Sequence, residues 1–190
     1  MNKIATIAGL AVAATAMTAS ADVLIDVDLS VADQLTITAT SGFSAVTASG
    51  SNFTGFLFDG LNGGTTGTAG TSVVSADFST AANASDGSPS VFIAGAGTDT
   101  GVNIWSFSTD STVSVTAGAT AFAGSATWSI SSGLYADLLA GAASGDIYFP
   151  ADDSGDIAGA ELLGTYRVVP APSALALLGL GGIVAGRRRR

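Results

Sequence analysis

Between positions 22 and 168 the chain consists of short runs in which apolar and polar residues alternate, and glycine-containing turns separate these runs. In the first run, from position 23 to 28, every second residue would face the same side of a strand. Pairs such as Asp59-Gly60 and Asp86-Gly87 tolerate the positive φ angles that tight turns need. Most of the 25 glycines lie in this region, and because glycine disfavours helices the pattern favours strands.

We expect eight to ten short strands, from runs at 23–28, 35–38, 53–58, 72–78, 91–94, 102–107, 112–116, 122–130, 147–149 and 162–169. This spacing predicts an all-β fold, a single antiparallel β-sandwich of the jelly-roll or immunoglobulin-like type. Residues 22–168 would form this one domain, which is long enough to bury a core. The stretches 62–72 and 80–89 are rich in small and polar residues and are interpreted as long loops within it.

One stretch has helical spacing instead. Leu134, Asp137 and Leu138 follow Ser131-Ser132, which can cap a helix of two or three turns. The sequence therefore predicts one short helix near residues 133–142, as a lid or a corner of the domain.

Residues 1–21 have the three parts of a secretory signal peptide. Lys3 supplies the positive start, an apolar run follows, and Ala19 and Ala21 form an A-x-A cleavage site. A retained membrane helix would need about 20 apolar residues, more than this run offers. Cleavage is expected after Ala21, which makes Asp22 the first residue of the mature chain.

Residues 169–190 combine three features. The segment begins with Val169, Pro170, Ala171 and Pro172, continues with an uncharged stretch at 173–186, and ends with Arg187, Arg188, Arg189 and Arg190. The prolines favour an extended, accessible backbone. As a helix the uncharged stretch would reach about 21 Å, only marginally enough to cross a bilayer. The arginines would stay on the cytoplasmic side and place the acidic domain outside.

This arrangement resembles the PEP-CTERM sorting signal, although Ala171 stands where that signal usually has Glu. The resemblance implies a transient membrane segment, processing by an exosortase-type enzyme, and delivery to the outer surface or exopolysaccharide (biofilm) matrix of a Gram-negative-type bacterium. An ordinary C-terminal membrane anchor is the alternative.

Charge and composition exclude several classes of function. All 15 acidic residues lie in 22–168, where Arg167 is the single basic residue. Such a domain repels phosphate backbones, so nucleic acid is not an expected partner. The chain has no His and no Cys, which excludes Ser-His and Cys-His nucleophiles, imidazole metal sites and disulfides. We expect no catalytic residues and no resident metal or cofactor.

Three groups of residues keep alternatives open. Asp152, Asp153 and Asp156 share a loop that could bind Ca²⁺, although solvated turn acids are the simpler interpretation. Asp26 and Asp28 would share one strand face, as cation ligands or as charges protecting an edge strand. Trp105 and Trp128 could stack on sugar rings, but alternation with apolar neighbours favours the core.

The sequence therefore predicts a secreted, non-enzymatic matrix or cell-surface protein that contacts the export machinery, signal peptidase, an exosortase-type enzyme and extracellular polysaccharide. The main alternative is a carbohydrate-binding or adhesive module with calcium in its acidic loops. A secreted hydrolase with paired carboxylates is the weaker one.

Overall fold

The computed structural model describes residues 21–51, 54–64, 66, 68–70, 73–76, 78, 91–94, 100–105 and 112–169. The predicted signal peptide up to Ser20, and the sorting segment from Pro170 to Arg190, lie outside these residues, as does the expected loop at 80–89.

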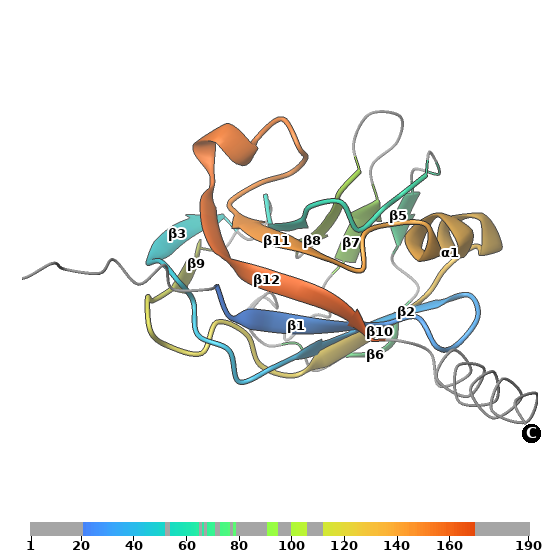
Figure 1. Ribbon diagram of the computed structural model, residues 1–190, viewed down its shortest axis with the longest axis horizontal. Helices are drawn as coiled ribbons and strands as arrows, with labels where there is room; N and C mark the ends of the chain where they lie inside the picture. The colour runs from blue at the N-terminus through green and yellow to red at the C-terminus, as the bar shows by residue number, and fades with distance from the viewer. Residues whose placement is uncertain are drawn as a thin grey trace, which may run out of the picture.

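Within the described residues the chain is mostly β, with one short α-helix and one 3₁₀ turn (Figure 1). In chain order the elements are β1 Val23–Asp28, β2 Gln34–Ala39, β3 Ala48–Ser51, β4 Phe56–Phe58, β5 Thr68–Gly70, β6 Val73–Ala76, β7 Val91–Ala94, β8 Val102–Trp105, β9 Thr112–Val115, β10 Ser125–Ser129, α1 Ser132–Leu139, β11 Ser144–Phe149, η1 Ile157–Gly159 and β12 Glu161–Val169. Each of the ten predicted runs contains a strand. β3 and β5 were missed, and β5 corrects the prediction that 62–72 is entirely loop.

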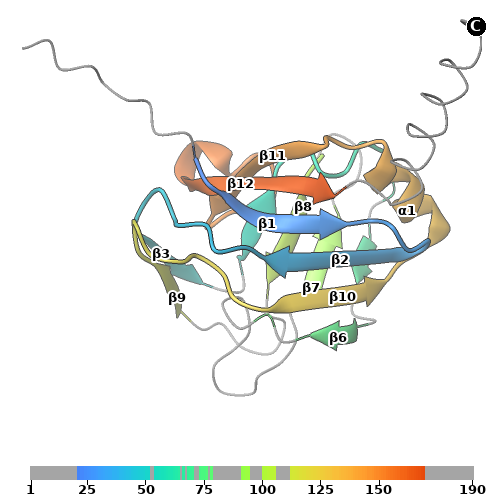
Figure 2. The same cartoon turned by 60° about the horizontal axis from the view of Figure 1, so that its bottom comes forward.

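Among the described residues ten strands form one sheet, in the order β5-β7-β8-β4-β11-β12-β1-β2-β10-β6, and β3 pairs with β9 in a small second sheet. The large sheet curls, so that β6, β10, β2, β1 and β12 lie on one side while β7 and β8 lie behind them (Figure 2). The expected single antiparallel sandwich is therefore not clearly present. The strands do not separate into two stacked sheets, and the large sheet is mixed.

The parallel pair is formed by β1 and β12, the first and last strands. Val23 lies opposite Thr165, and Asp28 lies opposite Val169. On its other edge β1 pairs with β2 in antiparallel fashion, and β12 pairs likewise with β11. Because β1 and β12 run in the same direction, the chain enters the body at one end of this pair and reaches Val169 at the other (Figure 2).

The core lies inside the curl of the sheet. Ile25, Val27, Leu35, Ile37, Ala126 and Trp128 are buried at alternating positions of β1, β2 and β10, which confirms the predicted strand period. Phe56 stacks on Phe149 with ring centroids 4.4 Å apart and meets the edge of Phe122 at 5.0 Å. Trp128 is 0 % exposed, which confirms its predicted place in the core. The side chain of Trp105 is not among the parts of the chain that the structure describes.

Helix α1 lies where the sequence predicted a helix near 133–142: it begins one residue earlier, at Ser132, and ends three residues earlier, at Leu139. The Ser131 side chain caps it by accepting a hydrogen bond from the Leu134 N–H at 3.2 Å. Tyr135 donates its hydroxyl to the Leu29 carbonyl at 2.7 Å, and Asp137 accepts from the Thr66 N–H at 2.8 Å. These bonds fix the helix as a corner at the end of the sheet where β1 and β12 finish (Figure 1).

The parallel pair needs a glycine on β12. A Cβ atom added to Gly164 would lie 2.6 Å from Leu24 Cγ and 2.8 Å from the Asp22 carbonyl oxygen. Both distances are shorter than real Cβ contacts, and Leu24 is itself buried in the core. Gly164 therefore permits the close approach of β1 to β12.

We predict that Gly164→Ala lowers the free energy of unfolding by about 1–3 kcal/mol, because the added methyl group overpacks this contact. Gly159→Ala is the matched control, since a Cβ atom there meets nothing within 4 Å, and its effect is expected within about 0.5 kcal/mol. Urea unfolding of both variants measures the difference. Equal stability of the two variants would show that the strands tolerate a side chain at this point.

Candidate functional site

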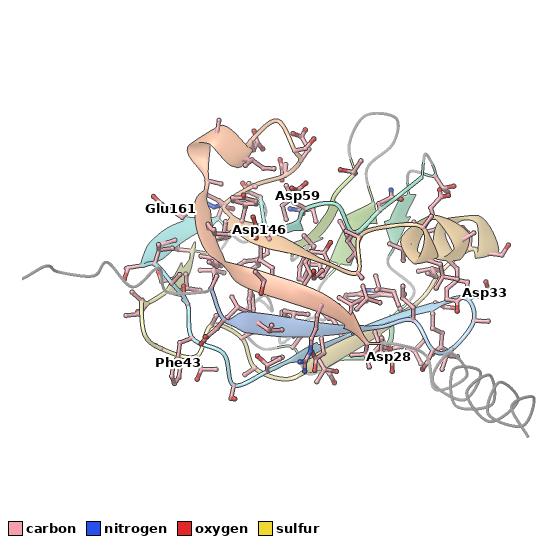
Figure 3. The ribbon with its side chains drawn as sticks, viewed as in Figure 1. Asp28, Asp33, Phe43, Asp59, Asp146 and Glu161 are labelled. Carbon is pink, nitrogen blue, oxygen red and sulfur yellow. The ribbon has the colours of Figure 1, made fainter. Side chains whose placement is uncertain are left out.

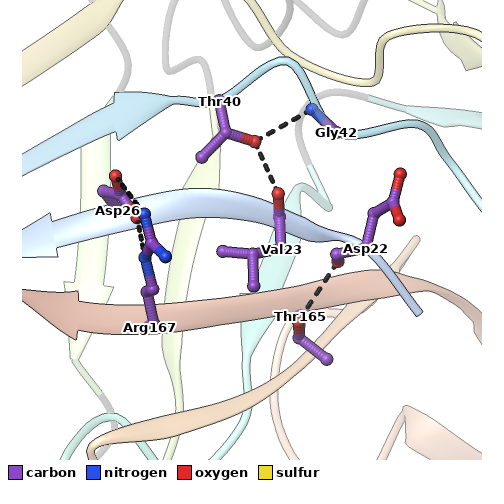
Figure 4. A network of polar contacts seen from close by, with 7 residues as sticks. All are labelled: Asp22, Val23, Asp26, Thr40, Gly42, Thr165 and Arg167. Atoms are coloured by element: carbon purple, nitrogen blue, oxygen red, sulfur yellow. Dashed lines mark hydrogen bonds and ion pairs between the residues drawn. The ribbon is translucent and has the colours of Figure 1, made fainter. Parts of the chain in front are cut away.

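The first residue of the expected mature chain is anchored in the fold. The Asp22 carbonyl accepts hydrogen bonds from the Thr165 N–H at 2.9 Å and the Thr165 hydroxyl at 3.1 Å (Figure 4). The Asp22 carboxylate accepts from the Phe43 N–H at 2.9 Å. Asp22, which follows the predicted cleavage site at Ala21, is therefore bound both to the last strand and to the segment after β2.

An ion pair joins the same two strands further along. Arg167 Nε lies 2.6 Å from Asp26 Oδ1, and its Nη2 donates to Asp26 Oδ2 at 3.2 Å (Figure 4). The hydrogen bond to Asp26 and the negative charge of Asp26 raise the pKa of the Arg167 guanidinium. The bidentate pair joins two residues that lie opposite each other in the β1–β12 register.

Asp26 and Asp28 do not protect an edge strand. β1 has a partner on each side, so that interpretation is wrong. Asp26 pairs with Arg167, and the Asp28 carboxylate accepts from the Ser30 N–H at 2.7 Å, at the start of the turn into β2.

Thr40 holds the other edge of β1. Its hydroxyl donates to the Val23 carbonyl at 2.5 Å and accepts from the Gly42 N–H at 3.0 Å (Figure 4). We use the name terminal clasp for Asp22, Val23, Asp26, Thr40, Gly42, Thr165 and Arg167. Through Thr40 and Gly42 the clasp connects β1 to the segment after β2, and through Thr165 and Arg167 it connects β1 to β12, the last strand.

Val169 is the last residue of β12. It lies opposite Asp28, and 36 % of its surface is exposed. The N–H of its neighbour Val168 donates to the Ala143 carbonyl at 2.7 Å. Of the predicted sorting motif, Val169 is thus extended as expected, while Pro170, Ala171 and Pro172 lie outside the described residues, as do the four terminal arginines.

Two of the three loop acids, Asp153 and Asp156, accept hydrogen bonds from neighbouring backbone groups. Asp156 Oδ2 accepts from the Asp152 N–H at 3.0 Å, and Asp153 Oδ1 accepts from the Gly155 N–H at 2.7 Å. Burial, followed by the charges of Asp156 and Asp153, raises the pKa of Asp152. In the part of the chain that the structure describes, no three acidic side chains are grouped as metal ligands. The geometry fits turn acids, which was the simpler of the two interpretations.

A second acidic group was not predicted. Asp59 follows β4 and Asp146 lies on the neighbouring β11, and the Asp59 N–H donates to the Asp146 carbonyl at 3.0 Å (Figure 3). Tyr148 donates its hydroxyl to Asp146 Oδ2 at 3.2 Å, and Tyr166 donates to the Asp59 carbonyl at 2.8 Å. The sequence could have shown that Asp146 and Tyr148 share one face of a strand, because they are two positions apart. It could not have shown that Asp59 lies close to them, because 87 positions separate Asp59 from Asp146.

The chemistry open to this group is hydrogen bonding and charge attraction. Desolvation and the nearby carboxylates of Asp59 and Asp146 raise the pKa of both Tyr148 and Tyr166. Both phenols therefore stay protonated at neutral pH and act as donors, not as bases. The carboxylates can accept hydrogen bonds from hydroxyl groups or attract a cation.

Comparisons of the chain with protein-family models, with curated proteins and with solved structures found no match. Within the described ranges, no helix has the combination of length and apolar character that a bilayer span requires.

We predict that Asp152→Asn raises the melting temperature at pH 7. Because folding raises the pKa of Asp152, the folded state binds this proton more tightly than the unfolded chain and is penalised when the group ionises. Protonation of Asp152 removes this destabilisation as the pH falls. The increase in melting temperature caused by Asp152→Asn should therefore shrink with falling pH and vanish below the ordinary pKa of 3.8.

Asp33→Asn is the control, since it removes the same charge from an exposed turn that is separate from the loop. Thermal unfolding followed between pH 7 and pH 3 measures both variants. A gain of the same size for Asp33→Asn would assign the effect to net charge and not to crowding among the three loop acids.

Proposed function

We propose that this chain is a secreted, non-catalytic protein of the cell surface or extracellular matrix of a Gram-negative-type bacterium. In this proposal signal peptidase removes residues 1–21 during export, and an exosortase-type enzyme processes the segment 169–190. The mature body then associates with extracellular polysaccharide.

The attachment of Asp22 and of the end of β12 to the fold, just inside the two predicted processing points, carries this proposal. Asp22 is the first anchored residue of the terminal clasp, and Val169 ends β12. Cleavage after Ala21 and beyond Val169 would leave every hydrogen bond of the clasp in place. A body whose terminal clasp keeps its hydrogen bonds when both ends are removed suits a protein whose ends serve only as sorting signals.

The charge distribution supports the same role. The body carries all 15 acidic residues and Arg167, which itself pairs with Asp26. Such a surface attracts cations and hydrated neutral polymers and is repelled by phosphate. These are the properties expected of a component of a polysaccharide matrix.

The second candidate is a carbohydrate-binding or adhesive module that takes calcium in its acidic loops. One observation favours it: Asp152 has a raised pKa in part because Asp156 and Asp153 lie close, and a divalent cation would relieve this repulsion. Asp59, Asp146 and Tyr148 add carboxylate and phenol groups that can bind sugar hydroxyls.

The first test is the intact mass of the protein recovered outside its cell. We expect a chain that starts at Asp22 and lacks Arg187 to Arg190, and any attached sugar will add to this mass. A variant carrying both Pro170→Ala and Pro172→Ala should leave uncut precursor in the cell, while Ala160→Ser, outside the sorting segment, should be processed normally. Extracellular protein that keeps its terminal arginines would contradict the proposal.

The second test separates the two candidates. Thermal unfolding with calcium and with a chelator should give the same melting temperature for the matrix protein. The adhesive module predicts stabilisation of about 2.7 kcal/mol at a calcium concentration 100 times the dissociation constant. Asp153→Asn, which retains an acceptor for the Gly155 N–H, should then reduce that shift; this outcome would favour the calcium module over the matrix role.

A further inference from the structure

An apolar pocket lies at the end of the body where the chain leaves the last strand. Its volume is about 260 Å³, and its lining comes from the residue after β1, from α1 with the segment after it, and from β12: Leu29, Leu138, Leu139, Gly141, Ala142, Ala143 and Val168. Leu138 is buried, but 58 % of Leu139 is exposed.

Hydrogen bonds hold the walls of the pocket in place. Tyr135 on α1 donates to the Leu29 carbonyl at 2.7 Å, and the Val168 N–H donates to the Ala143 carbonyl at 2.7 Å. The pocket is therefore formed by fixed elements of the body.

Exposed apolar side chains lie at the same end of the body. Val31 follows Leu29 in the β1–β2 turn and is 54 % exposed, and Leu139 on α1 is itself at the pocket. Val169 is also exposed, but as the strand neighbour of Val168 it faces the other side of β12. Exposed apolar residues that lie together on a protein surface mark a place where another segment or molecule binds.

We propose that the pocket binds this chain's own apolar segment, residues 173–186, as long as the segment remains attached to the body. Val168 lines the pocket, and the apolar segment begins only five positions further along the chain. The intervening Pro170-Ala171-Pro172 spans about 9 Å when extended. The tether thus holds Leu175, Leu177 and Leu178 close to the pocket.

Size and tethering both favour this occupant. A volume of about 260 Å³ accommodates one or two leucine side chains, which matches the widely spaced leucines among the Ala and Gly residues of the segment. A short linker gives the segment an effective concentration in the millimolar range, far above that of a second copy in dilute solution.

Charge complementarity adds to the tether. Arg187 to Arg190 follow the apolar segment, whereas the body is strongly acidic. Asp28 lies opposite Val169 in the β1–β12 register, and Asp33 lies in the turn at the same end of the molecule (Figure 3). The arginines are attracted to this end and not repelled from it.

The interaction would shield the apolar segment from water before it meets a membrane. It does not depend on which enzyme processes the segment, or on whether any enzyme does. It therefore goes beyond the proposed function and can fail or succeed independently of it.

Disulfide cross-linking tests the proposal directly, because the chain has no cysteine of its own. The full 190-residue chain is made by cell-free synthesis without membranes, so that neither end is removed. Leu139→Cys is combined in turn with Leu175→Cys, Leu178→Cys and Leu180→Cys. Leu139 is exposed, so its substitution leaves the core intact.

The control pairs Ser30→Cys with the same three tail variants. Ser30 is exposed and follows β1 at the end of the body where Val169 lies opposite Asp28, but it does not line the pocket. Because the tether reaches both positions, we expect at least one Leu139 pair to form an intramolecular disulfide about tenfold faster than its Ser30 counterpart only if the segment is docked. Equal rates, or disulfides formed only between two chains, would overturn the proposal.

Discussion

The parallel pairing of the first strand with the last is the contact on which the rest of the structure depends. β12 lies between β11 and β1, so it joins the strands on one side of the large sheet to those on the other. The Asp26–Arg167 ion pair between β1 and β12 joins two residues that are 141 positions apart in the sequence. A sheet whose central strand comes last in the sequence is completed only when nearly the whole body is available. Such long-range pairing is slow to form, because the loop entropy must be lost before the contact is gained.

This topology fits the proposed route of the chain. A body that needs residues 161–169 to close its sheet remains open while those residues are still inside the cell, which suits export through a translocation channel. The same parallel arrangement separates the two ends. Asp22 is held beside Thr165 at one end, while Val169 leaves beside Asp28 at the other, next to the apolar pocket. In the proposed route, processing at one end would therefore take place away from the other.

Local patterns predicted the local structure well. Alternation placed β1, β2 and β10, and the Ser131 cap with Leu134 and Leu138 placed α1. β3 and β5 were missed because Ala48–Ser51 and Thr68–Gly70 are made of small and polar residues, without apolar alternation. The parallel register of β1 and β12 was beyond prediction, since β propensity does not encode the partner of a strand. For the same reason the sequence could not predict the Asp26–Arg167 ion pair or the closeness of Asp59 to Asp146, because both depend on the order of the strands in the sheet.

The most direct measurement compares two shortened chains, residues 22–169 and residues 22–160, by hydrogen exchange and thermal unfolding. Our account predicts that the first chain unfolds cooperatively and strongly protects the amides of β1 and β2. The second chain, which lacks β12, should show neither behaviour. Cooperative unfolding of the shorter chain with the same protection in β1 would contradict the claim that the last strand completes the fold.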